Sequence, residues 1–173
     1  MSIINNTINA TAIALFATEY TVKTMYHFLI PSYGVPEKSP MGFEIIERLP
    51  LEVAGLSSEY DNQFQCGMVK YTPMFTTQTL YKVFVSKKFG KFNRFLIKMA
   101  ILHEEGHYLD GSMTSVRSTE SELSADMNAI RQGNRIEKLA FGGFLSYSLL
   151  LSIGSKSATN ENTLRLKQLW SNL

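Results

Sequence analysis

The chain has 173 residues, enough for a domain of ordinary size with a hydrophobic core. Hydrophobic residues make up 45% of the chain and charged residues 18%, which excludes an intrinsically disordered protein. The net charge of +2 gives no strong signal for nucleic-acid binding, and the single cysteine, Cys66, excludes an internal disulfide. No basic residue precedes the first apolar run, so we expect no secretory signal and a cytoplasmic location.

The first predicted element is a helix over residues 8–30, where apolar residues recur at helical spacing. The stretch 31–40 contains three prolines and one glycine and is expected to be a loop. We expect a single domain in which this loop joins an N-terminal helical element (1–35) to a core (41–138). A C-terminal helical region (139–173) follows the core.

Three short segments rich in β-branched or aromatic residues are predicted to be strands, at 42–48, 64–71 and 80–86. Helical periodicity follows and predicts helices at 91–108, 119–130 and 135–153, then a polar tail at 155–162 and a short helix at 163–173. This order is typical of an α+β fold. We expect a small three-stranded antiparallel or mixed sheet that packs on the helix at 91–108, with further helices at both ends.

The longest apolar stretch runs from Leu139 to Ile153 and is interrupted by glycines and serines. It is shorter than the about 20 apolar residues that a membrane-spanning helix needs. A buried core helix is therefore favoured over a segment that contacts a membrane. This stretch and the N-terminal helix are also the candidate surfaces for a protein partner.

Residues 103–107 read His-Glu-Glu-Gly-His, an H-E-x-x-H motif inside the predicted helix 91–108. Histidines four residues apart lie one above the other on a helix, with Cβ atoms about 5–6 Å apart. His103 and His107 can therefore bind the same zinc ion. Glu104 would lie beside the metal, where it can take a proton from metal-bound water and pass it to the leaving amine.

We predict no catalytic or metal-binding role for the two remaining residues of the motif. Glu105 points to another face of the helix and is expected to be exposed. Gly106 has no side chain and permits a close approach of backbone or metal. The alternative for the whole motif is a pair of buried histidines that bind no metal.

A catalytic zinc site normally has three protein ligands, so a third is needed after the motif. We predict that Glu122 is this ligand and that Asp126, one turn further on, accepts a hydrogen bond from a ligand histidine. Ala125 between them permits close packing of two helices. Two alternatives remain. Glu120 replaces Glu122 as the ligand, or Glu122 folds back in a capping box that begins at Thr119.

HEEGH at 103–107 followed by ELSAD at 122–126 resembles the gluzincin metallopeptidases. It is similar to the HtpX-like proteases and to the ImmA/IrrE-type peptidases of phages and mobile elements. The resemblance implies a minimal zincin-like domain in which His103, His107 and Glu122 bind Zn²⁺ and Glu104 is the base. It also implies that an extended peptide pairs along the strand at 80–86. We give no role to Arg165 in the C-terminal tail.

We therefore predict a zinc metalloendopeptidase that hydrolyses peptide or protein substrates, with Zn²⁺ as its cofactor. The alternative is a catalytically idle module of zincin fold with a structural or regulatory role, for example in a virion. Cys66 is expected to lie in the core or in a strand. His27 is expected to be structural, and Tyr108 to point away from the site.

Overall fold

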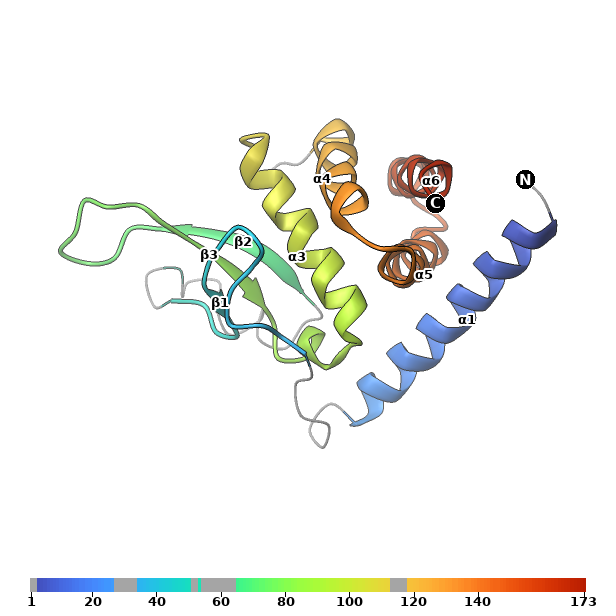
Figure 1. Ribbon diagram of the computed structural model, residues 1–173, viewed down its shortest axis with the longest axis horizontal. Coiled ribbons are helices and arrows are strands. Elements are labelled where there is room, and N and C mark those ends of the chain that lie inside the picture. Colours follow the sequence, from blue (N-terminus) through green and yellow to red (C-terminus); the bar gives the residue numbers. More distant parts are fainter. Residues whose placement is uncertain (1–2, 27–33, 51–52, 54–64, 113–117) are drawn as a thin grey trace.

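The computed structural model describes residues 3–26, 34–50, 53, 65–112 and 118–173 (Figure 1). It is an α+β fold, as predicted. The helices are α1 (Ile3–Tyr26), α3 (Arg94–Leu109), α4 (Thr119–Gln132), α5 (Arg135–Leu151) and α6 (Lys156–Ser171), and a 3-10 turn, η2 (Phe89–Lys91), precedes α3. The strands are β1 (Ile45–Ile46), β2 (Cys66–Tyr71) and β3 (Leu80–Val85).

The three strands form one mixed sheet in the order β1-β3-β2. β1 pairs parallel to β3 through Ile45 opposite Val83, and β2 pairs antiparallel to β3 through Met68 opposite the same residue. β3 ends in the buried run Val83, Phe84 and Val85, which suits the centre of a sheet. β1 is much shorter than the predicted strand at 42–48, and β2 forms the outer edge next to α3.

α3 lies between the sheet and the other helices (Figure 1). Its first turn is capped by the side chain of Asn93, which accepts a hydrogen bond from the Leu96 N–H at 2.9 Å. It ends just before Gly111, which has a φ of +70° and stops the helix where the sequence predicted. Leu96 and Met99 on the apolar stripe of α3 are fully buried. The same stripe continues to the two histidines of the motif.

α4 packs directly on α3, and the closest approach is at Gly106. A Cβ atom added at Gly106 would lie 2.6 Å from the Cα of Ala125 and 3.0 Å from its carbonyl oxygen. Both atoms belong to the backbone of α4, so they cannot move aside without moving the helix. The absence of a side chain at Gly106 therefore sets how closely the two helices approach.

We expect the Gly106→Ala variant to lose about 1–3 kcal/mol of stability, because the added methyl group forces α3 and α4 apart. Metal affinity should fall as well, because Glu122 is on α4 and both histidines are on α3. Urea unfolding and zinc titration measure the two effects. Gly142→Ala in α5 is the matched control, since the atoms nearest to its Cβ would be side-chain atoms of Leu169 and Trp170, at 3.0 Å, and not backbone. Equal zinc affinity of the two variants would contradict the expectation.

α5 buries Phe141 and Leu145 almost fully, as predicted for a core helix, but Leu150, Leu151 and Ile153 at the end of the predicted apolar stretch are exposed. It begins in a capping box between Asn134 and Glu137. The prediction for the tail was wrong, because α6 already begins at Lys156 and takes up the polar segment. α6 buries little more than Leu166 and Leu169, so apolar periodicity gives almost no signal for its first half.

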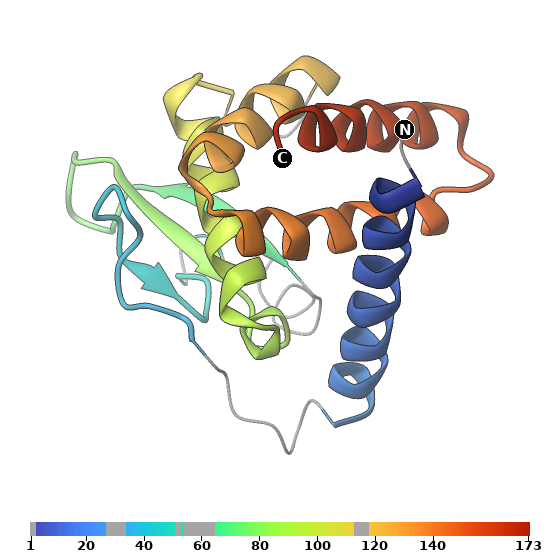
Figure 2. The same ribbon diagram turned by 45° about the vertical axis from the view of Figure 1, so that its right-hand side comes forward.

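α1 crosses α5 on the side away from the sheet (Figure 2). Phe16 anchors it, with its ring 5.5 Å from that of Phe92 and 5.7 Å from that of Phe144. Leu15, Val22 and Met25, which belong to the apolar pattern read from the sequence, are exposed instead. α1 begins earlier than predicted, and the predicted end at 27–30 lies outside the described residues. Among the described helices, none combines the length and the apolar character needed to cross a membrane.

Candidate metal centre

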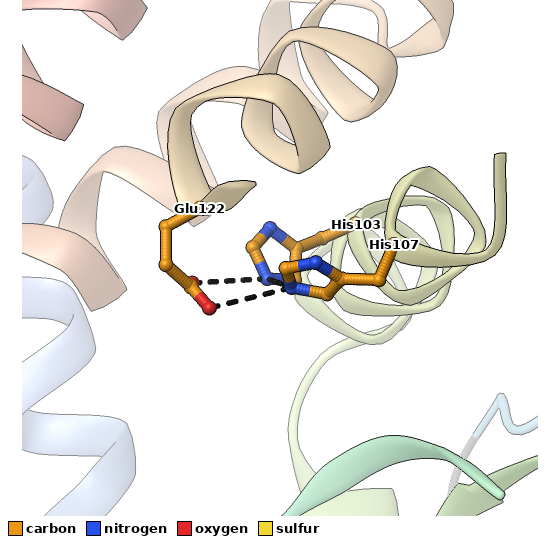
Figure 3. Close-up of side chains that lie close together, drawn as sticks. All are labelled: His103, His107 and Glu122. Carbon is orange, nitrogen blue, oxygen red and sulfur yellow. Dashed lines mark hydrogen bonds and ion pairs between the residues drawn. The ribbon is translucent and has the colours of Figure 1, made fainter. Parts of the chain in front are cut away.

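His103 and His107 of α3 and Glu122 of α4 point toward one another (Figure 3). The Nε2 atoms of the two histidines are 3.1 Å apart. Each of these nitrogens lies 3.3 Å from one carboxylate oxygen of Glu122, His103 from Oε2 and His107 from Oε1. All three side chains are buried. The structure thus brings together the three residues that the sequence predicted as ligands.

These distances fit a divalent metal ion held by all three residues. Two ligand atoms about 2.0–2.1 Å from zinc and at a tetrahedral angle lie about 3.3–3.4 Å apart, close to the separations measured here. Two imidazole nitrogens and one carboxylate are also a donor set typical of zinc. Among the described residues, this is the one group of histidine, cysteine and acidic side chains with such spacing. The centre can therefore hold a metal ion.

Asp126 forms a hydrogen bond with the ring nitrogen of His103 that does not face Glu122. Its Oδ1 lies 2.8 Å from the histidine Nδ1. Burial alone would lower the pKa of His103, but hydrogen bonds to Asp126 and Glu122 outweigh it and raise the pKa to about 9. The pKa of Glu122 is held well below its usual range by its hydrogen bonds to the two histidines, despite the opposing effect of burial. In the absence of a metal ion, protonated His103 supplies the positive charge of the centre.

Metal binding at neutral pH is therefore expected to release about one proton per ion, because the metal needs the Nε2 lone pair that the proton occupies. The His103 pKa of about 9 means that the apparent Zn²⁺ affinity should rise by about tenfold per pH unit up to that pH. Calorimetric titration with Zn²⁺ in buffers of different ionisation enthalpy counts the protons. Zinc uptake without proton release at pH 7 would contradict this assignment.

His107 is oriented by two serine hydroxyls. Its Nδ1 lies 3.0 Å from the Ser112 Oγ and 3.1 Å from the Ser121 Oγ. Ser121 donates its hydroxyl proton to Ser112, and Ser112 donates to the carboxylate of Asp110. Because both hydroxyl protons are directed toward Asp110, the serine oxygens are left as acceptors for an Nδ1–H of His107. That tautomer leaves the Nε2 lone pair facing the centre.

Arg165, on α6, binds two acidic side chains of α4, those of Asp126 and Glu122. Its Nε lies 2.7 Å from Oδ2 of Asp126, and its NH1 lies 3.0 Å from Oε2 of Glu122. The guanidinium neutralises Asp126, which is fully buried, and leaves Oε1 of Glu122 facing His107. No role was predicted for this arginine. The only signal for it in the sequence was a faint resemblance of the tail at 161–169 to the arginine-containing end of the family.

Glu104 lies at a cavity of about 570 Å³ beside the centre. Its Oε2 accepts a hydrogen bond from the backbone N–H of Met68 in β2, at 3.1 Å. The cavity is lined by His103, Glu122 and Arg165 as well as by residues 65–70 along β2. The glutamate predicted as the base is therefore placed between the proposed ligands and the edge of the sheet.

The structure favours Glu122 in the metal-binding group over the two alternatives, which were Glu120 as the ligand and Glu122 in a capping box. Glu120 is exposed, and it is not part of the metal-binding group found among the described residues. The cap of α4 is Ser118, whose Oγ accepts from the Ser121 N–H, so Thr119 is the first helical residue. The alternative of a capping box that begins at Thr119 is therefore wrong, because the cap lies one position earlier and Glu122 is not at the third helical position that such a box requires.

Glu105 is a second correction, because it is completely buried rather than exposed. Its Oε1 accepts the Met41 N–H at 2.7 Å, which ties the segment before β1 to α3. The segment and β3 cover this face of α3, as the contacts of Tyr108 with Phe43 and Tyr81 also indicate. Tyr108 therefore points away from the centre, as predicted. His27 lies outside the described residues.

The strand beside the centre is β2 and not the segment at 80–86. β3 lies inside the sheet, with β1 on one side and β2 on the other, so its edges are already paired there. β2 is the strand whose outer edge faces the cavity. Cys66 lies in this strand, as expected, and is half-buried. The order of strands depends on tertiary contacts, and their order along the chain does not determine it.

Comparisons of the chain with protein-family models, with curated proteins and with solved structures give no match.

Proposed function

We propose that this chain is a zinc-dependent hydrolase that cleaves peptide bonds, with a zincin-like centre of the gluzincin type. The observation that carries the proposal is the convergence of His103, His107 and Glu122 on one point, with Glu104 of the same helix at the adjoining cavity. An H-E-x-x-H pair supports zinc chemistry because it supplies two ligands and an acid–base group within a single helical turn.

Bound zinc would lower the pKa of a water molecule toward about 7 and polarise the scissile carbonyl. Glu104 would accept the proton of that water and later donate it to the leaving amine. Asp126 and Arg165 would hold His103 in the orientation that presents Nε2 to the centre. The serine hydroxyls behind His107 would do the same for the second imidazole.

An extended peptide would pair along the outer edge of β2. The Met68 N–H points to Glu104, and the Val83 N–H opposite points to the carbonyl of Glu44, so these two groups face away from each other. By the alternation of an antiparallel pair, the backbone groups of Met68 and Lys70 then face outward. A substrate strand that took over the Met68 N–H would release the Glu104 carboxylate for catalysis.

Metal analysis and metal removal test the proposal together. The purified protein should contain about one zinc ion per chain. It should hydrolyse a casein or peptide substrate, lose this activity on treatment with a chelator, and recover it on addition of Zn²⁺. A zinc-loaded protein that cleaves no peptide bond in a broad mixture of unfolded proteins would overturn the peptidase assignment.

A metal-binding module without hydrolytic activity is the alternative. It shares the ligand set and differs only in what Glu104 does. Zinc binding without hydrolysis, together with stable binding of peptides along β2, would favour it.

A further inference from the structure

We propose that the cavity beside His103 and Glu104 binds a large apolar side chain of the substrate, at the residue next to the bond that is cut. This inference rests on the proposed hydrolase function and adds the substrate class. The cavity adjoins the metal centre, and its volume of about 570 Å³ lies within the range of small-molecule and side-chain pockets.

Aromatic rings lead away from the centre in a continuous row. The ring of Phe141 lies 6.3 Å from the imidazole of His103, and Phe144 follows at 6.4 Å from Phe141. Phe89 lies a further 6.4 Å from Phe144. All three phenylalanines line the cavity and make this part of its wall apolar. They come from α5 and η2, elements that are far apart in the sequence.

Three further residues near the centre add apolar surface to the cavity. Phe84 of β3, Met68 of β2 and Ala100 of α3 line the same space. The charged side chains of the lining are the proposed base Glu104, the proposed ligand Glu122 with its ion-pair partner Arg165 at 3.0 Å, and Lys70 of β2. A charged substrate side chain that entered the part lined by the phenylalanines would lose its hydration among apolar carbon atoms. A phenylalanine or leucine side chain would replace water on those carbons at a gain.

The size of the side chain at position 100 is expected to set the space available in the pocket. Ala100 precedes His103 by three residues, so both lie on one face of α3. Ala100 is half-buried and lines the cavity. Leucine at this position would therefore be expected to occupy part of the pocket. Small substrate side chains would still fit, and large ones would not.

The test uses the zinc-loaded Glu104→Gln protein, which should bind peptides without cleaving them. Three blocked heptapeptides are compared by calorimetry: six alanines with phenylalanine, alanine or aspartate in the middle. The phenylalanine peptide should bind about tenfold or more tighter than the other two, as expected for burial of an aromatic side chain. Equal affinities, or no binding of any of the three, would overturn the inference.

The Ala100→Leu change in the same background should remove the preference for the phenylalanine peptide and leave the alanine peptide unaffected. Ala140→Leu is the matched control, because Ala140 is also a half-buried helical alanine but lines a different cavity. A second variant, Phe144→Ala, enlarges the pocket and should weaken phenylalanine binding by loss of wall contacts. If neither change alters the ratio of the affinities, the pocket is assigned wrongly.

The two proposals fail in different ways. Zinc-dependent cleavage by the wild-type protein without preference for apolar residues would overturn the pocket and leave the hydrolase. Selective binding of the phenylalanine peptide by a zinc-loaded wild-type protein that cleaves nothing would overturn the hydrolase and leave the pocket.

Discussion

Replacing Glu104 by glutamine is expected to lower peptide hydrolysis by about 10²–10⁴-fold while zinc stays bound, which is the usual contribution of a general base. The amide retains the shape of the side chain and an oxygen that can accept the Met68 N–H. It cannot accept a proton from water at neutral pH. Zinc content by elemental analysis and kcat/KM on a fluorogenic peptide measure the two halves of the expectation.

Glu105→Gln is the matched control, since it makes the same change at the next residue. Glu105 lies on another face of α3 and accepts the Met41 N–H, so the substitution should alter stability more than activity. Full activity of Glu104→Gln would show that this glutamate is not the base. Loss of zinc from Glu104→Gln would instead show that the carboxylate helps to hold the metal.

Glu122→Gln is expected to lower zinc affinity by more than about a hundredfold. Loss of a side chain that merely orients a ligand typically costs about 10–100-fold in affinity, and loss of a charged ligand should exceed that. The substitution removes the one negative charge that faces both Nε2 atoms, at 3.3 Å from each. Competition with a chromophoric chelator measures the affinity directly.

The same substitution at Glu120, two residues earlier on α4, is the control. Glu120 is exposed, so its replacement should leave zinc affinity within a factor of about two, as for most surface changes. If Glu120→Gln lost the metal and Glu122→Gln kept it, the third ligand would be misassigned. If both kept it, the two histidines would need a different partner.

Local pattern determined most of the helices. Residues close together in the chain predict the apolar stripe of α3, the end of α3 at Gly111 and the start of α4. The reason is that a helix depends on i to i+4 contacts and on caps. The first half of α6 escaped prediction, since few of its residues are apolar, whereas the second half agrees with the helix predicted at 163–173. The strand at 42–48 was predicted longer than the observed β1, because the extent of a strand depends on a partner strand remote in sequence.

The sequence by itself placed His103, Glu104 and His107 on one helical turn, because four-residue spacing alone aligns two side chains. It also named Glu122 and Asp126, although only the packing of α4 on α3 at Gly106 decided between Glu122 and Glu120. Tertiary structure alone put Arg165 against both carboxylates, buried Glu105 and made β2 the strand beside the centre. These three features depend on which segments, remote in sequence, pack together, and the local spacing of residues does not determine that packing.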